Sequence, residues 1–69
     1  MNDNVFGKIL YDLRKENQIS QKSLGFIFNV CNQTISAWER GLTEPDLLHL
    51  TKIADYFQVS VDYLLGREE

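Results

Sequence analysis

The stretch "ISQKSLGFIFNVCNQTISAWERG", residues 19–41, contains two helix starts separated by a short turn. Ser20 and Cys31 each follow an apolar residue and precede another one four positions later. Such a pair of apolar residues clamps the chain where a helix begins. A serine hydroxyl is a good acceptor for free backbone N–H groups, whereas a thiol is a weak one. Either Cys31 or Asn32 is therefore expected as the cap of the second helix, and the choice shifts the helix start by one residue.

The connection between these two helices is only a few residues long and contains Asn29. Asn adopts the left-handed backbone conformation that such a turn usually needs. Gly25, in the middle of the first helix, costs about 1 kcal/mol relative to Ala. Either it makes room for a close approach of the next helix or it is a tolerated weak point. This arrangement is typical of a helix-turn-helix motif, whose second helix enters the DNA major groove.

The apolar pattern outside this stretch predicts three further helices. Phe6, Leu10 and Leu13 fall on one face of a first helix. Asp46 and Ser60 are good caps that each precede a further apolar pattern. We therefore expect one all-α domain over residues 1–69, because 69 residues are too few for two cores. Its five helices are expected at about 4–16, 20–28, 31–40, 46–57 and 60–65.

The composition allows a compact core but argues against a strongly basic nucleic-acid binder. Hydrophobic residues make up 43% of the chain, and the net charge is −3. Phosphate contacts dominate the affinity for nucleic acid, so an acidic total is unfavourable. The charge is uneven, however. Residues 1–41 hold five basic and four acidic side chains, and residues 42–69 hold two basic and six acidic ones. A DNA-binding face is therefore expected in the first 41 residues.

The chain lacks the residue sets of an enzyme or a metal site. Cys31 and His49 are its only cysteine and histidine, so we expect no metal, no internal disulfide and no cofactor. No nucleophile–base pair or Gly-rich phosphate loop supports catalysis. We interpret His49 as a surface or boundary residue, and Cys31 as a partly buried small hydrophobe in preference to a redox sensor. No apolar run has the length of a membrane span, and no signal peptide opens the chain, so a cytoplasmic protein is expected.

Residues 19–41 resemble the phage-repressor and Cro-like, or Xre-type, helix-turn-helix regulators. The matching residues are Ser20-Gln21, Leu24, Val30, Thr34-Ile35-Ser36 and Trp38-Glu39-Arg40-Gly41. The flanks "LRKEN", "EPD" and "VSVDYLLG" match as well, so the resemblance covers nearly the whole chain. It implies a compact five-helix, lambda-repressor-like domain with its motif at about 20–40. The implied function is transcription regulation in a prokaryote or phage, as a repressor that binds a near-palindromic operator as a homodimer.

The sequence departs from the family pattern at several positions. The family usually has Ala at 25, Gly at 29 and 58, Gly or Asn at 18, and Ser or Thr at 31. This chain has Gly25, Asn29, Gln58, Gln18 and Cys31. The family also shows polar residues where Phe26 and Ile27 stand.

One face of the helix over 31–40 is predicted to read bases, and it carries no carboxylate. Its residues are Asn32, Gln33, Ser36, Ala37 and Arg40. Asn and Gln amides pair bidentately with adenine, and an alanine methyl can touch the thymine methyl. The resemblance places readout at Asn32, Gln33 and Ala37, with Ser36 as a further candidate. Taken without the motif, the same face could be an ordinary solvated one.

Backbone contacts are expected around this face. The resemblance implies that Gln21, where free N–H groups suit a phosphate, holds the DNA backbone. The further candidates are Lys22, Thr34, Arg40 and Thr43. For Lys22 and Thr43, simple exposure to solvent explains the sequence equally well.

The resemblance also implies a structural ion pair between Arg14 and Glu39. Phe26 and Ile27 either form an exposed partner surface or belong to a larger core. The candidates for a dimer edge are Tyr63, Leu64 and Leu65, whose alternative is packing of the last helix onto its own core. A protein-interaction module on the same fold is the alternative function.

Overall fold

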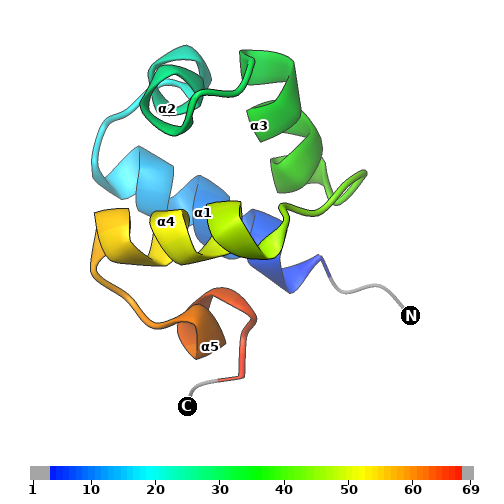
Figure 1. The fold of residues 1–69 in the computed structure, drawn as a ribbon, viewed down its shortest axis with the longest axis vertical. Coiled ribbons are helices and arrows are strands. Elements are labelled where there is room, and N and C mark those ends of the chain that lie inside the picture. The colour runs from blue at the N-terminus through cyan, green and yellow to red at the C-terminus, as the bar shows by residue number, and fades with distance from the viewer. Residues whose placement is uncertain (1–3, 68–69) are drawn as a thin grey trace.

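The computed structural model describes residues 4–67, which form five α-helices and no strand (Figure 1). The helices are α1 (Val5–Glu16), α2 (Gln21–Phe28), α3 (Asn32–Arg40), α4 (Leu47–Phe57) and α5 (Val61–Leu64). The predicted all-α class and the five helices are confirmed. Each predicted helix starts one residue too early, because the cap residue precedes the helix that it starts. The predicted ends agree, except that the last helix ends at Leu64 and not at 65.

Side-chain caps fix the start of three of these helices. The side chains of Ser20, Asp46 and Ser60 each accept a hydrogen bond from the backbone N–H three residues later. The α3 helix is different: its N-cap is Cys31, whose thiol makes no cap bond. The alternative start with Asn32 as the cap is wrong, because Asn32 is the first residue inside the helix.

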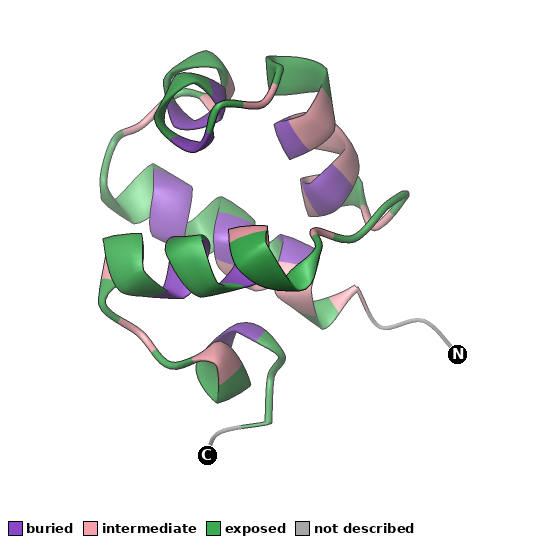
Figure 2. Ribbon diagram, viewed as in Figure 1, coloured by how far each residue is buried: buried purple, intermediate pink, exposed green. Residues whose placement is uncertain are grey.

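The core lies where the inner faces of all five helices meet (Figure 2). Its fully buried side chains are Leu10, Leu24, Ile35, Ile53 and Leu64. The α1 helix packs against α3 and α5, while α2 packs against α3 and α4. This arrangement leaves one side of α3 facing outward.

The structure corrects the prediction that Leu64 belongs to a dimer edge. Leu64 is fully buried, because the short α5 helix turns it toward α1 and α4. Its neighbours Tyr63 and Leu65 point elsewhere on the turn and are 40% and 41% exposed. Only these two remain on the surface.

Four non-glycine residues among residues 4–67 have the left-handed backbone conformation, and the first of them, Asn4, is the N-cap of α1. Asn29 has φ 61°, as predicted for the turn between α2 and α3. Gln18 and Gln58 have φ 58° and 59° and lie just after the ends of α1 and α4, at positions where the resembling family has Gly or Asn. The left-handed conformation costs an ordinary side chain about 1–2 kcal/mol. Asn29 tolerates it better than either glutamine.

Candidate nucleic-acid interface

The corner between α2 and α3 is built on close backbone contact. The N–H of Val30 donates to the carbonyl of Gly25 at 2.8 Å. A Cβ atom on the buried Gly25 would lie 2.6 Å from the Val30 carbonyl oxygen and 3.3 Å from the Asn32 nitrogen. The close-approach interpretation of Gly25 is therefore confirmed. The absence of a side chain there lets the start of α3 lie against α2.

The α3 helix has an inner face and an outer face. Ile35 and Trp38 are buried at 0% and 4% exposure. The outer face consists of the five residues named from the sequence: Asn32, Gln33, Ser36, Ala37 and Arg40. Asn32, Gln33 and Arg40 are exposed, and Ser36 and Ala37 are half-buried. The structure thus brings all five together on one accessible surface.

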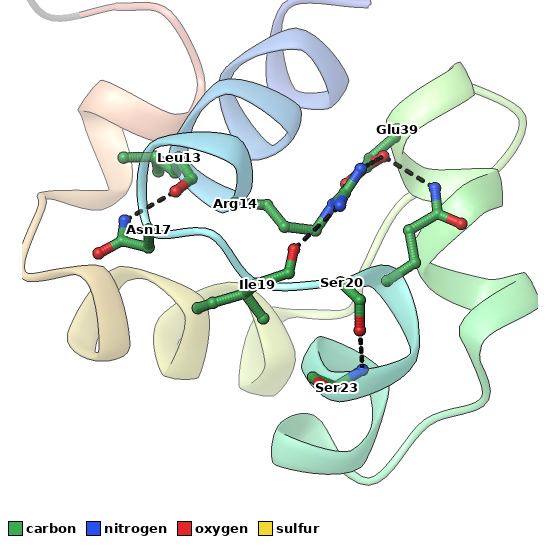
Figure 3. A network of polar contacts seen from close by, with 8 residues as sticks. Leu13, Arg14, Asn17, Ile19, Ser20, Ser23 and Glu39 are labelled. Atoms are coloured by element: carbon green, nitrogen blue, oxygen red, sulfur yellow. Dashed lines mark hydrogen bonds and ion pairs between the residues drawn. The ribbon is translucent and has the colours of Figure 1, made fainter.

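The single carboxylate of α3 is directed away from the outer face. Glu39 accepts a hydrogen bond from Nε of Arg14 at 2.6 Å and another from its NH2 nitrogen at 3.1 Å (Figure 3). The two side chains are 5% and 8% exposed. Such a bidentate pair compensates the charge of the carboxylate at close range. The outer face therefore has no free negative charge of its own.

The same pair connects three helices and a loop. Nε2 of Gln21, the first residue of α2, donates to Oε1 of Glu39 at 3.0 Å. The NH1 nitrogen of Arg14 donates to the Ile19 carbonyl, also at 3.0 Å. Arg14 belongs to α1 and Glu39 to α3, so this network holds the start of α2 in a fixed relation to both.

The residues considered for backbone contacts lie around the outer face but not at one point. Gln21 is half-buried at the start of α2, and Lys22 beside it is exposed. Thr34 is half-buried, and its hydroxyl lies 3.2 Å from the Cys31 thiol. Arg40 and Thr43 are exposed. Arg40 ends α3, and Thr43 lies in the loop that leads to α4.

The structure also brings residues of α1 close to this surface, which the sequence reasoning missed. Lys8 and Tyr11 line a hollow together with Gln21, Ser36 and Arg40. The helical pattern of α1 showed which side is apolar, but it carried no signal of what its polar side faces. Their place beside α3 follows only from the packing of α1 against α3.

Cys31 is exposed, which corrects the expectation of a partly buried small hydrophobe. As the N-cap it lies outside the helix, so no inner face covers it. A hydrogen bond with the Thr34 side chain lowers the pKa of its thiol. His49 is half-buried: its Nδ1 lies 2.9 Å from Asp46 Oδ1, and its ring centroid 5.8 Å from that of Trp38. This is the boundary position expected for His49.

Two apolar surfaces lie outside the outer face of α3. On α2, Phe26 is 87% exposed and Ile27 is 42% exposed, so the core does not cover either of them. On the other side, Leu47 is 81% exposed beside a groove of about 250 Å³ that Pro45 and Leu65 also line. The first surface is the α2 patch, and the second is the α4–α5 groove.

The described part of the chain contains no group of three or more His, Cys, Asp or Glu side chains that could bind a metal. Within residues 4–67, no helix has the length and hydropathy needed to span a membrane.

Comparison with known proteins agrees with this architecture. A model of the helix-turn-helix family matches residues 10–64. The chain belongs to this helix-turn-helix family. It is 36% identical over 63 residues to the HTH-type transcriptional regulator ImmR of Bacillus subtilis strain 168, which is 91% of this chain and 50% of that protein. It is 40% identical over 65 residues to the repressor protein C2 of Salmonella phage P22, which is 94% of this chain and 30% of the repressor.

This helix-turn-helix chain also matches a solved structure over almost its full length. The crystal structure of the P22 c2 repressor in complex with synthetic operator 9T superposes with a TM-score of 0.85 at 38% sequence identity. The match covers 93% of this chain and 97% of that chain. By contrast, the chain spans half or less of the length of ImmR and of the C2 repressor.

Proposed function

We propose that this chain binds double-stranded DNA sequence-specifically and regulates transcription, as a repressor, with α3 in the major groove. The observation that carries this proposal is the outer face of α3. Its amide and small side chains are accessible, while the helix's single carboxylate is buried in the pair with Arg14. The C2 repressor, a relative with the same fold, was crystallised with operator DNA. In a bacterial cell such a regulator acts on DNA in the cytoplasm.

The side chains near the start of α3 are assigned to base readout. Asn32 and Gln33 are exposed and carry amides that pair bidentately with adenine. Ala37 and Ser36 follow on the same face, where the alanine methyl suits a thymine methyl. Readout is thus assigned to Asn32, Gln33, Ser36 and Ala37.

Backbone contacts are assigned to Gln21, Lys22, Thr34, Arg40 and Thr43. An amide NH2 group has two hydrogens, so Gln21 retains a donor besides the one that Glu39 accepts. Free N–H groups in the first turn of α2 add to this site. Such contacts position the protein on DNA but carry no sequence information.

We infer that the chain binds its operator as a homodimer. The α4–α5 groove, lined by the exposed Leu47 and Leu65, supports this inference, and Tyr63 of α5 is exposed as well. A dimer places two α3 helices on two half-sites about one helical turn apart. The expected operator is therefore a near-palindrome.

Selection from a random duplex pool at low salt tests the proposal. The affinity for the winning sequence is then compared with that for scrambled DNA at moderate salt. Enrichment of a near-palindrome with two half-sites is the expected result. A single, non-repeated half-site would contradict the dimer but retain the DNA-binding function. No enrichment, with weak binding that moderate salt abolishes, would refute the regulator proposal.

The exposure of Phe26 supports a second function, a protein-interaction surface on the same fold. Phe26 is 87% exposed and its neighbour Ile27 is 42% exposed, and an exposed apolar patch of this kind often marks a protein-binding site. Phe26→Ser would leave operator binding unchanged under this proposal. It would abolish association with any protein that the parent chain captures.

A further inference from the structure

A hollow of about 430 Å³ opens between α1 and α3. Lys8, Tyr11 and Asp12 line it from α1, while Ser36 and Arg40 line it from the outer face of α3. The three α1 residues are spaced so that they share one side of their helix. The hollow therefore continues the proposed DNA-binding face onto a helix outside the helix-turn-helix motif.

The charges in the hollow favour an anion. Glu39 also lines it, but its carboxylate is already paired with Arg14 and hydrogen-bonded to Gln21. Among residues 4–67 no ion pair involves Lys8 or Arg40. Asp12 is the one unpaired carboxylate that opposes these two cations. One positive charge remains in excess, next to the donors of Gln21.

Tyr11 adds a neutral donor whose ring is held in place. Its ring centroid lies 5.4 Å from Cζ of Arg14 and 5.8 Å from Nζ of Lys15. The face of an aromatic ring attracts cations at such distances. Tyr11 is 46% exposed and lines the hollow, so its side chain is accessible to a ligand there.

We propose that this hollow receives a phosphate of the DNA backbone that flanks the base-readout site, with Lys8 and Tyr11 of α1 as contacts beside Arg40. This inference rests on the proposed DNA-binding function and extends it to the first helix. When α3 lies in the major groove, the strand bordering the groove passes the side of α3 that carries Ser36 and Arg40. A cation, a hydroxyl and an amide donor around one hollow suit a phosphate oxygen. These α1 contacts would position the chain without reading bases.

The salt dependence of operator affinity tests this proposal. Each phosphate neutralised by a cation contributes about 0.9 to the slope of log affinity against log salt. Lys8→Gln should reduce the slope by about this amount, so the affinity lost between 50 and 200 mM salt becomes about threefold smaller. Lys52→Gln on α4 makes the same charge change outside the hollow and is the matched control. It should leave the slope unchanged.

A chemical substitution in the DNA locates the contact. Methylphosphonate replacements, placed singly along the selected operator, remove one phosphate charge at a time. At one flanking position the replacement should weaken binding of the parent and of the Lys52→Gln variant more than binding of Lys8→Gln, which retains only the contacts of Tyr11 and Arg40. Tyr11→Phe should weaken operator binding without changing the salt slope, because the lost group is neutral. Asp12→Asn should strengthen it.

The outcomes separate this proposal from the proposed function. One outcome is that Lys8→Gln behaves like Lys52→Gln in the salt slope and in the methylphosphonate scan while the parent binds the operator. That outcome overturns only the proposed phosphate contact of α1. If the parent selects no duplex, both proposals fall. Lys8 and Tyr11 are exposed, so both variants should fold, which helical circular dichroism checks.

Discussion

Gln21 and Glu39 are hydrogen-bonded across the corner of the helix-turn-helix motif, with Gln21 Nε2 donating to Glu39 Oε1 at 3.0 Å. The oxygen that accepts this bond also accepts one from Arg14. A carboxylate only accepts, so the bond fixes which end of the Gln21 amide faces Glu39. Glu39 of α3, the helix assigned to base readout, thereby orients the side chain of Gln21, which is assigned to a contact with the DNA backbone.

The Gln33 amide should contribute to the choice of one base pair. Gln33→Ala is expected to lose about 1–3 kcal/mol of binding to the selected operator and to relax the preference at that pair. Titration of the operator and of single-pair variants measures both effects. Thr51→Ala on α4 is the control, and it should bind like the parent. Equal affinity of Gln33→Ala and the parent for the operator would refute the assignment.

The pair between Arg14 and Glu39 should be costly to break from one side. Arg14→Met leaves the Glu39 carboxylate buried with Gln21 as its remaining partner, and about 3–5 kcal/mol of unfolding free energy should be lost. Urea unfolding measures this loss. The double variant Arg14→Met/Glu39→Leu removes both charges and should recover much of the stability. A loss of less than about 1 kcal/mol of unfolding free energy in Arg14→Met would contradict the prediction, because ion pairs exposed to solvent contribute only that much.

Gly7 should resist a substitution that normally stabilises a helix. Gly→Ala in a helix interior usually gains about 1 kcal/mol. Here the added Cβ would lie 2.5 Å from the Glu39 carbonyl oxygen and 2.7 Å from that of Trp38. These are backbone atoms of α3, so α1 must shift, and a loss of about 1–3 kcal/mol is expected. Thermal unfolding decides the sign, with Lys8→Ala at the exposed neighbouring position as the control. A stabilised Gly7→Ala variant would mean that the two helices separate easily.

The Cys31 thiol should react at lower pH than an ordinary cysteine. The hydrogen bond from Thr34 favours the thiolate and lowers the pKa, so more thiolate is present at neutral pH. Thr34→Val removes the hydroxyl and should raise the pKa, which moves the pH profile of alkylation upward. Thr34→Ser keeps the hydroxyl and should follow the parent. Mass spectrometry of iodoacetamide labelling measures the rates, since Cys31 is the only cysteine. Superimposable profiles for all three proteins would contradict the prediction.

The residues predicted as the DNA-reading face were correctly placed on one accessible surface, because a helix repeats locally. Apolar Ile35 and Trp38 defined the inner side of α3, and the opposite side followed from the helical period. Cross-helix contacts have no such local rule. The sequence pattern contained no signal for the bond between Gln21 and Glu39, because they lie on different helices.

The sequence by itself determined the helices of this protein, because caps, apolar periodicity and the left-handed Asn29 act within a few residues of chain. Only the tertiary structure decided which residues of those helices are covered. It buried Leu64, left Cys31 exposed, and set Lys8 across a hollow from α3. Burial depends on which helices meet and at what distance, and those contacts join residues that are far apart in the sequence.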